Sequence, residues 1–300
     1  MTSPFARPQV ALSLTDPDRE LLRYAGQLAR LFAWREVHFS HVQANQDGTV
    51  FDSATWVERM RQEVEQHFGS ATAELRSVFH AAEGPRLDQL LNLAAVHSRD
   101  LVVMGHRRAR SGRRSLARRM AMISPASVWL VPEGSSTRIS KILVPTDFSS
   151  HSVDALKVAI SVAQAANVKS VQAVHIFFDP STIRYDEHVA EVVGQEQAAF
   201  ETFVAGVDTQ GVAVEPIIQE GTHPAQDILR VAERQGSDLI VMNTRGRSNA
   251  ASVLLGSVTS DTMAATHIPL LTVKHFGGRM SLMQALLNHH LWDQDVPKTN

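Results

Sequence analysis

The chain has 300 residues, of which 44% are hydrophobic and 20% charged, and its formal net charge is −2. This composition is typical of a globular protein of two domains, and it gives no overall field that would draw the chain to nucleic acid or to a membrane. The sequence has no cysteine, which excludes disulfides and thiolate chemistry. No apolar run is long enough to cross a bilayer, and the first eight residues lack the apolar core of a signal peptide. We therefore expect a cytoplasmic protein.

The same series of strands and helices is predicted twice along the chain. In the first half, strands at 9–16, 37–42, 78–84, 98–104 and 127–131 alternate with helices through Tyr24 to Leu31, over 53–74 and over 87–97. In the second half, strands at 141–147, 171–177, 212–221, 238–242 and 269–273 alternate with helices through 155–162 and over 181–207, 224–234 and 258–265. The two halves therefore read as copies of one domain.

Strands that alternate with helices predict an α/β fold, and continuous apolar strands predict a parallel sheet covered on both faces. We expect two tandem flavodoxin/Rossmann-like domains, each a doubly wound five-stranded parallel sheet with the strand order 3-2-1-4-5. Their predicted boundaries are 1–134 and 139–276, with a polar linker at 133–138 and a C-terminal helical tail at 277–300. The two domains are expected to pack about a pseudo-two-fold axis.

A glycine-spaced loop follows the fourth strand of the second half. Asn243-Thr-Arg-Gly246 comes directly after the strand 238–242, and Gly256-Ser257 follows at the predicted start of a helix. Glycines let backbone approach a ligand, and a helix N-terminus offers unpaired N–H groups to a phosphate. In the predicted strand order, Asp147 ends the neighbouring first strand, so Asp147 and this loop should meet at one edge. Asp147 as a helix cap, and the glycines as plain turn residues, are the alternative interpretations.

The first half carries a broken copy of this loop. Gly105 is present, but counting at the same spacing places Arg108 and Arg118 at the next two glycine positions and Arg119 at the hydroxyl. We therefore expect this half to be degenerate and to bind no ATP in the usual pose. A sharper hypothesis is that Arg118 fills the phosphate pocket and pairs with Asp16.

These motifs resemble the universal stress protein family in its tandem form, whose members are flavodoxin-like or Rossmann-like and some of which bind ATP. The resemblance rests on Ile142-Leu-Val-Pro-Thr-Asp147, on Val241-Met242 and on the glycine loop, in which the ATP-binding members have Gly, two residues, Gly, nine residues, then Gly and Ser or Thr. Asn243 departs from this pattern at the first glycine. If that position requires a positive φ, Asn is the side chain that tolerates it best.

The resemblance implies a nucleotide site in the second half. Asp147 would contact the ribose, and backbone near Val174 the adenine. Gly246, Gly256, Ser257 and the N–H groups of Val258 and Thr259 would surround the phosphates. The whole set of expected site residues is Thr146, Asp147, Val174, Met242, Asn243, Gly246, Gly256, Ser257, Val258 and Thr259. The expected cofactor is ATP, with Mg²⁺ and the choice among ATP, ADP and AMP left open.

No catalytic motif for phosphoryl transfer is present, and no lysine is placed to meet a γ-phosphate. We expect binding without catalysis, with ATP hydrolysis slow or absent, and a nucleotide-dependent regulator of the stress response. A ligand-free scaffold that binds protein partners is the alternative, and an adenylylating or phosphate-transferring enzyme is a third class. A homodimer stays open.

Other features favour ordinary structural roles. His41 and His175 are expected to be packed and hydrogen-bonded, and His289-His290 is a weak metal signal, so no metal site is predicted. The basic residues Arg107, Arg108, Arg110, Arg113, Arg114, Arg118 and Arg119 lack interleaved aromatics, which favours a solvated face over nucleic-acid binding. The apolar stripe within 280–292 could dock on the chain itself or on a partner.

Overall fold

The computed structural model describes residues 4–44, 50–69, 75–106, 115–181, 186–244 and 255–274. Its first half contains β1 (Pro8–Leu12), α1 (Asp18–Leu31), β2 (Glu36–Gln43), α2 (Ser53–His67), β3 (Arg76–Glu83), α3 (Arg86–Val96), β4 (Leu101–His106), α4 (Leu116–Ile123) and β5 (Ser127–Pro132). Its second half contains β6 (Ile142–Pro145), α5 (Ser150–Ala165), β7 (Ser170–Phe177), α6 (Asp186–Ala205), β8 (Ala213–Glu220), α7 (Pro224–Gln235), β9 (Leu239–Asn243), α8 (Ser257–Ala265) and β10 (Leu270–Val273). In these ranges no helix is both long and apolar enough to cross a membrane.

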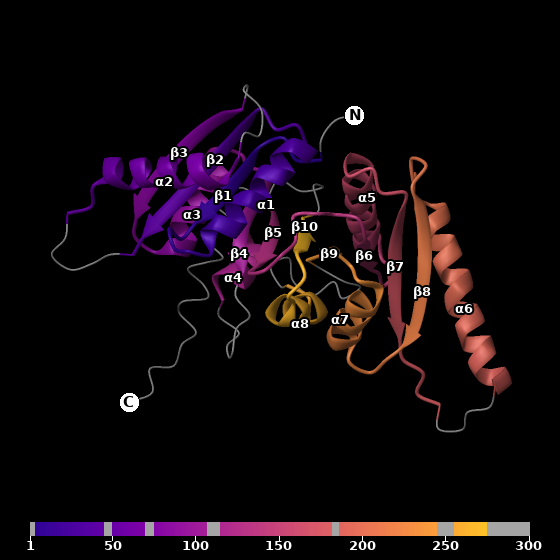
Figure 1. Ribbon diagram of the computed structural model, residues 1–300. Helices are drawn as coiled ribbons and strands as arrows, with labels where there is room; N and C mark the ends of the chain where they lie inside the picture. The colour runs from indigo at the N-terminus through magenta and orange to yellow at the C-terminus, as the bar shows by residue number, and fades with distance from the viewer. Residues whose placement is uncertain are drawn as a thin grey trace, which may run out of the picture.

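The strands form one ten-stranded sheet in the order β3-β2-β1-β4-β5-β10-β9-β6-β7-β8. Each half is parallel and has the predicted order 3-2-1-4-5, so the α/β fold prediction is confirmed. The halves meet in the middle of the molecule, where β5 and β10 pair antiparallel with Leu130 opposite Leu270 (Figure 1). An antiparallel pair of corresponding strands is the arrangement that a two-fold relation between the halves requires. The boundaries at 1–134 and 139–276 stay a prediction, and the 277–300 tail lies outside the described residues.

Both faces of the sheet are covered, which explains why its central strands are apolar without alternation. On β9, Leu239 and Val241 belong to the core cluster that includes α1, α2 and α5, whereas Ile240 and Met242 belong to the cluster with α3, α4, α7 and α8. Neighbouring residues of one strand therefore enter two different cores. The parallel strands all present their carboxyl ends at one edge of each half, which is where ligands bind in this architecture.

Local signals explain where several helices begin and end. Asp52 caps α2 by accepting from Ala54 N, and Ser149 caps α5 by accepting from Ser152 N. Helix α7 starts at Pro224 and ends at Gln235, and its C-cap residue Gly236 has a φ of 64°, which suits a glycine. The helix predicted over 53–74 ends at His67, and the helix predicted over 181–207 runs from Asp186 to Ala205.

An aspartate before the fourth strand of each half holds the chain that leads into the first strand. Asp100 accepts from Ala6 N and Arg7 N, each at 2.9 Å. Asp238 accepts from Ser140 N at 2.8 Å and Lys141 N at 3.0 Å, and from Ser140 Oγ at 2.6 Å. The equivalent contacts in both halves show that the duplication extends to side-chain interactions.

We predict that Asp238→Ala lowers the free energy of unfolding by about 1–2 kcal/mol, because it leaves two backbone N–H groups without their carboxylate partner. Urea denaturation followed by circular dichroism measures this change. Asp208→Ala is the control, because the Asp208 carboxylate is exposed and, among the residues that the structure describes, accepts only from the nearby Gln210 N. Equal stability of the two variants would contradict this role of Asp238.

Candidate functional site

The predicted site of the second half lies at the carboxyl end of β6. Thr146 is buried there, and its N–H donates to Val174 O on β7 at 2.8 Å. His175 on β7 contacts the same turn, with 2.8 Å between His175 Nδ1 and Thr146 O. Thr146 and Val174, which lie far apart in the sequence, are therefore neighbours at this edge. His175 is buried and hydrogen-bonded, as expected.

Asp147 is half-buried and fixed at the start of α5. Its Oδ1 accepts from Ser152 Oγ at 2.7 Å and from Ser149 N at 3.1 Å. Ser149, not Asp147, is the N-cap residue of α5. Between them Phe148 has a φ of 61°, and its ring packs on His175 with 4.2 Å between ring centroids. The turn thus holds the carboxylate in one orientation at the edge of the sheet.

Asn243 joins the end of β9 to the helix that follows this turn. Its Nδ2 donates to His151 O in the first turn of α5 at 2.9 Å, and its O accepts from Thr259 Oγ1 of α8 at 2.8 Å. Asn243 is the last residue of β9 and does not have a positive φ. The positive φ considered for this position is therefore not required, and the side chain holds α5 against β9.

The N-terminus of α8 is the proposed phosphate-binding element. Gly256 is the N-cap residue, and its N–H donates to Thr244 O at 2.9 Å, which fixes the helix start next to the end of β9. Because the N-cap residue is a glycine, it supplies no side-chain cap. Ser257 is exposed and Gly256 and Val258 are half-buried, whereas Met242 and Thr259 are buried. Gly246 lies outside the described residues.

The structure therefore brings the described part of the predicted set to one edge. Backbone contact links Thr146 to Val174, and the Asn243 side chain links β9 to the start of α5 where Asp147 lies. Thr259 and Gly256 link α8 to the same strand end. Met242 is only 4% exposed and offers a ligand little surface, because it is part of the core under α7 and α8.

The corresponding turn of the first half has the acid and the hydroxyl exchanged. His41 Nδ1 lies 3.0 Å from Leu12 O, and Leu14 has a φ of 57°, so Leu12 and Leu14 correspond to Thr146 and Phe148. Ser13 then takes the place of Asp147, and Asp18 the place of Ser152. Ser13 Oγ donates to Asp18 Oδ1 at 3.0 Å, and Leu14 N donates to Asp18 Oδ2 at 2.6 Å. Burial raises the pKa of the Asp18 carboxyl.

The hypothesis of an Arg118–Asp16 pair is wrong. The Asp16 side chain is 91% exposed and its Oδ1 lies 3.4 Å from Arg19 Nη2. Ser115 is the N-cap residue of α4, so Ser115, and not Arg118, corresponds to Gly256. Equal spacing misplaced Arg118 because the connection from β4 to α4 is shorter than the one from β9 to α8. Arg107, Arg108, Arg110, Arg113 and Arg114 lie outside the described residues.

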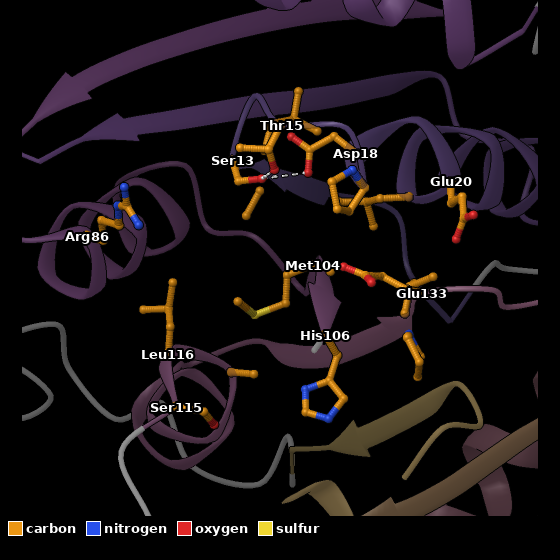
Figure 2. A pocket seen from close by; sticks show the side chains of 18 of the residues that line it. Ser13, Thr15, Asp18, Glu20, Arg86, Met104, His106, Ser115, Leu116 and Glu133 are labelled. Carbon is orange, nitrogen blue, oxygen red and sulfur yellow. Dashed lines mark hydrogen bonds between the residues drawn. The ribbon is translucent and has the colours of Figure 1, made fainter. Parts of the chain in front are cut away.

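An open cavity of about 420 Å³ lies at the carboxyl edge of the first half. Figure 2 shows Ser13, Thr15 and Asp18 on one side of it, with His106 and Ser115 on another. Ser13 Oγ and Thr15 Oγ1 are 2.7 Å apart, and Arg86 enters from the start of α3. Arg118 is not among the residues that line this cavity. The expectation that Arg118 fills the pocket is therefore wrong.

One cluster of candidate metal-ligating side chains was not predicted from the sequence. One ring nitrogen from each of His38, His80 and His97 lies within 4.8 Å of the others. These residues come from β2, β3 and the end of α3, so no short spacing in the sequence connects them. Only the pairing of β2 with β3, in which Ser40 is opposite His80, would have placed them together.

Comparisons with known proteins agree with this architecture. The universal stress protein family matches residues 138–274. Universal stress protein MJ0531 of Methanocaldococcus jannaschii is 34% identical over 139 residues, which are 45% of this chain and 81% of that protein. Universal stress protein MJ0577 of the same organism is 26% identical over 159 residues, which are 46% of this chain and 97% of that protein.

A crystal structure of a universal stress protein from Archaeoglobus fulgidus covers 91% of this chain and 99% of its own, with a TM-score of 0.62 and 18% identity. This similarity shows that the fold extends over both halves. The sequence matches, the duplicated strand order and the turn geometry that both halves share after their first strand lead to one conclusion. The chain belongs to the universal stress protein family.

Proposed function

We propose that the second half binds ATP, or another adenine nucleotide, at the carboxyl edge of β6 and β9. The observation that carries this proposal is that Asn243 ties the strand end below the N-terminus of α8, whose N-cap residue is a glycine, to the first turn of α5, which holds Asp147. A carboxylate and a helix N-terminus at one edge suit the two ends of a nucleotide, its ribose and its phosphates. The family resemblance supports the same assignment.

The proposed roles follow from the chemistry of each group. The Asp147 carboxylate accepts hydrogen bonds from ribose hydroxyls, which donate. The Val174 carbonyl keeps a second lone pair after it accepts from Thr146 N, so backbone there can meet the adenine edge. The phosphates lie at Gly256 and Ser257, where the N–H groups of the first turn and the helix dipole favour an anion. Gly246 is proposed to complete this loop, and Mg²⁺ to accompany the phosphates.

We propose a regulator and not an enzyme. The described site contains a carboxylate already held by Ser149 and Ser152, and no lysine or arginine of the described residues is part of it. Fast phosphoryl transfer requires positioned positive charge and an activated nucleophile. Nucleotide would instead act by binding one conformation or assembly more tightly than another. The proposed setting is the cytoplasm during the stress response, and a homodimer is one such assembly.

Calorimetric titration of the full chain with ATP, ADP and AMP tests this proposal. We predict one nucleotide per chain, and an affinity that falls about 10–100-fold in Asp147→Ala, since a charge-assisted hydrogen bond is worth about 1.5–3 kcal/mol. Asp16→Ala is the matched control, because Asp16 is an exposed carboxylate in the turn of the other half. Unchanged affinity in Asp147→Ala would exclude the ribose role, and no heat with any nucleotide would exclude the proposed function.

The second candidate function is a ligand-free scaffold for protein partners. Asn243 favours it, because a side chain stands where ATP-binding family members have glycine. The ultraviolet spectrum and the mass spectrum of the freshly purified protein distinguish the two. Adenine nucleotide that copurifies supports the first proposal, and its absence together with silent calorimetry supports the scaffold.

A further inference from the structure

Three histidines of the first half converge on one face of the sheet. His38 Nδ1 and His80 Nε2 are 2.7 Å apart, and one nitrogen of each of the three rings lies within 4.8 Å of the others. The ring centroids of His97 lie 5.0 Å from His38 and 4.6 Å from His80. His38 is buried, and His80 and His97 are half-buried, so the cluster is closed on the protein side and open to water on the other.

The fold places these side chains together for a specific reason. In the parallel pair β2–β3, Ser40 is opposite His80, so His38 lies diagonally across from His80 on the same face. Helix α3 packs on β2 and β3, and His97 is its C-cap residue, whose N–H donates to Leu93 O. The cluster lies toward the amino end of β2, at the edge of the first half opposite its carboxyl-edge cavity.

Glu36 gives His38 the orientation of a metal ligand. Its Oε1 lies 2.8 Å from His38 Nε2, so Nε2–H donates to the carboxylate and the lone pair of Nδ1 points toward His80. A carboxylate that accepts from the far nitrogen of a histidine is the usual support of a histidine ligand. Arg76 and Arg99 lie 3.4 Å and 3.9 Å from Glu36 and hold it in place.

Arg99 lies beside the cluster, 3.9 Å from Glu36, and would repel a cation there. The Glu36 carboxylate offsets part of that repulsion.

A hydrogen bond between His80 and His38 explains why these two rings lie close together, but it does not explain the position of the third ring. Within the described part of the chain, the ring of His97 has no hydrogen-bond partner. In a tetrahedral site with metal–nitrogen bonds of about 2.0–2.1 Å, the nitrogens are about 3.4 Å apart. The present separations bracket this value, so modest rotations of the rings would bring all three nitrogens onto one ion.

We propose that His38, His80 and His97 bind a Zn²⁺ ion, with water as the fourth ligand. Three imidazoles and no thiolate are a donor set that Zn²⁺ accepts in tetrahedral geometry. Such an ion joins β2, β3 and α3 and stabilises the first half independently of any nucleotide. Glu36 is the positioning residue of the site.

The test uses the full chain, freed of metal by a chelator and then titrated with ZnCl₂ in competition with a chromophoric chelator. We predict one Zn²⁺ per chain with a dissociation constant of about 1 µM or lower. His80→Ala and His97→Gln are each predicted to weaken binding by about 100-fold or more, and Glu36→Gln by about 10-fold. His188→Ala is the control, since His188 is a histidine with a carboxylate neighbour, Asp179, outside the cluster.

Three further readouts separate a built site from adventitious binding. Zn²⁺ should raise the melting temperature of the wild type and of His188→Ala, but not of His97→Gln. The Co²⁺-substituted protein should show the visible absorption of a four-coordinate site. Circular dichroism identifies a variant that has failed to fold. If His80→Ala does not fold, His97→Gln, which lies at a half-buried helix end, provides the test instead. Wild-type protein that binds no Zn²⁺ in the micromolar range, or folded cluster variants that bind it as the wild type does, would overturn the proposal.

Discussion

Trp129→Ala is expected to lower the free energy of unfolding by about 3–5 kcal/mol, the cost of removing a fully buried aromatic side chain and leaving a cavity. Trp129 has no exposed surface and is the largest fully buried side chain among the described residues. Its ring lies 6.2 Å from those of Tyr24 and Phe32, and its backbone is opposite Leu271 where β5 meets β10. One substitution therefore weakens both the first core and the joint between the halves.

Urea denaturation followed by far-ultraviolet circular dichroism measures the effect of Trp129→Ala. Phe178→Ala is the matched control, because Phe178 is an aromatic residue that is 64% exposed, and its change should stay within about 0.5 kcal/mol. A loss below about 1 kcal/mol in Trp129→Ala would show that the core around β5 is less tightly packed than its burial indicates.

Gly256→Val is expected to weaken ATP binding by about 100-fold or more, corresponding to ~3 kcal/mol. The proposed phosphate position lies against the backbone at the start of α8, and a branched side chain there would stand between the N–H groups and the phosphates. Gly256 has φ −55° and ψ 141°, a conformation open to any residue. The substitution should thus block the ligand without straining the backbone.

The control for this prediction is Gly194→Val, at a glycine of α6 around which a Cβ would find open space. Calorimetry with ATP should show wild-type affinity for Gly194→Val and the loss for Gly256→Val, while both keep the wild-type far-ultraviolet spectrum. Retained affinity in Gly256→Val would place the phosphates elsewhere.

The sequence was sufficient for the strand order, because each apolar strand and each amphipathic helix has its own local signal and right-handed crossovers leave few arrangements. It also located Thr146, Val174 and Asn243 at one edge, since parallel strands end on the same side. Helix ends were less certain: the helix predicted over 53–74 ends at His67. Propensity alone does not fix a terminus that packing decides.

Positions in the first half were misassigned where the two copies differ in loop length. Arg118 was placed by counting, but the shorter loop moves Ser115 to the start of α4. The buried acid of the turn after β1 is Asp18, five residues after Ser13, and not the exposed Asp16 that was expected to pair with Arg118. The hydroxyl and the carboxylate of this hydrogen bond have exchanged places between the two halves. The contact is kept, but the two sequences no longer match at these positions.

The histidine cluster shows a different limit of sequence reasoning. His41 stood out because it recurs as His175, and both hydrogen-bond to the turn after the first strand. His38, His80 and His97 have no such repetition and come together only through strand register and the length of α3. Sites assembled from separate elements become visible only when the three-dimensional arrangement is known.

Crystals of the full chain soaked with ATP would reveal, through difference density, whether nucleotide binds at the edge shared by Asp147, Asn243 and the start of α8. We expect phosphate density at the N–H groups of Ser257 and Val258, with a ribose beside Asp147. An empty edge in the second half, or nucleotide density in the cavity beside Ser13 and Asp18 instead, would contradict this expectation.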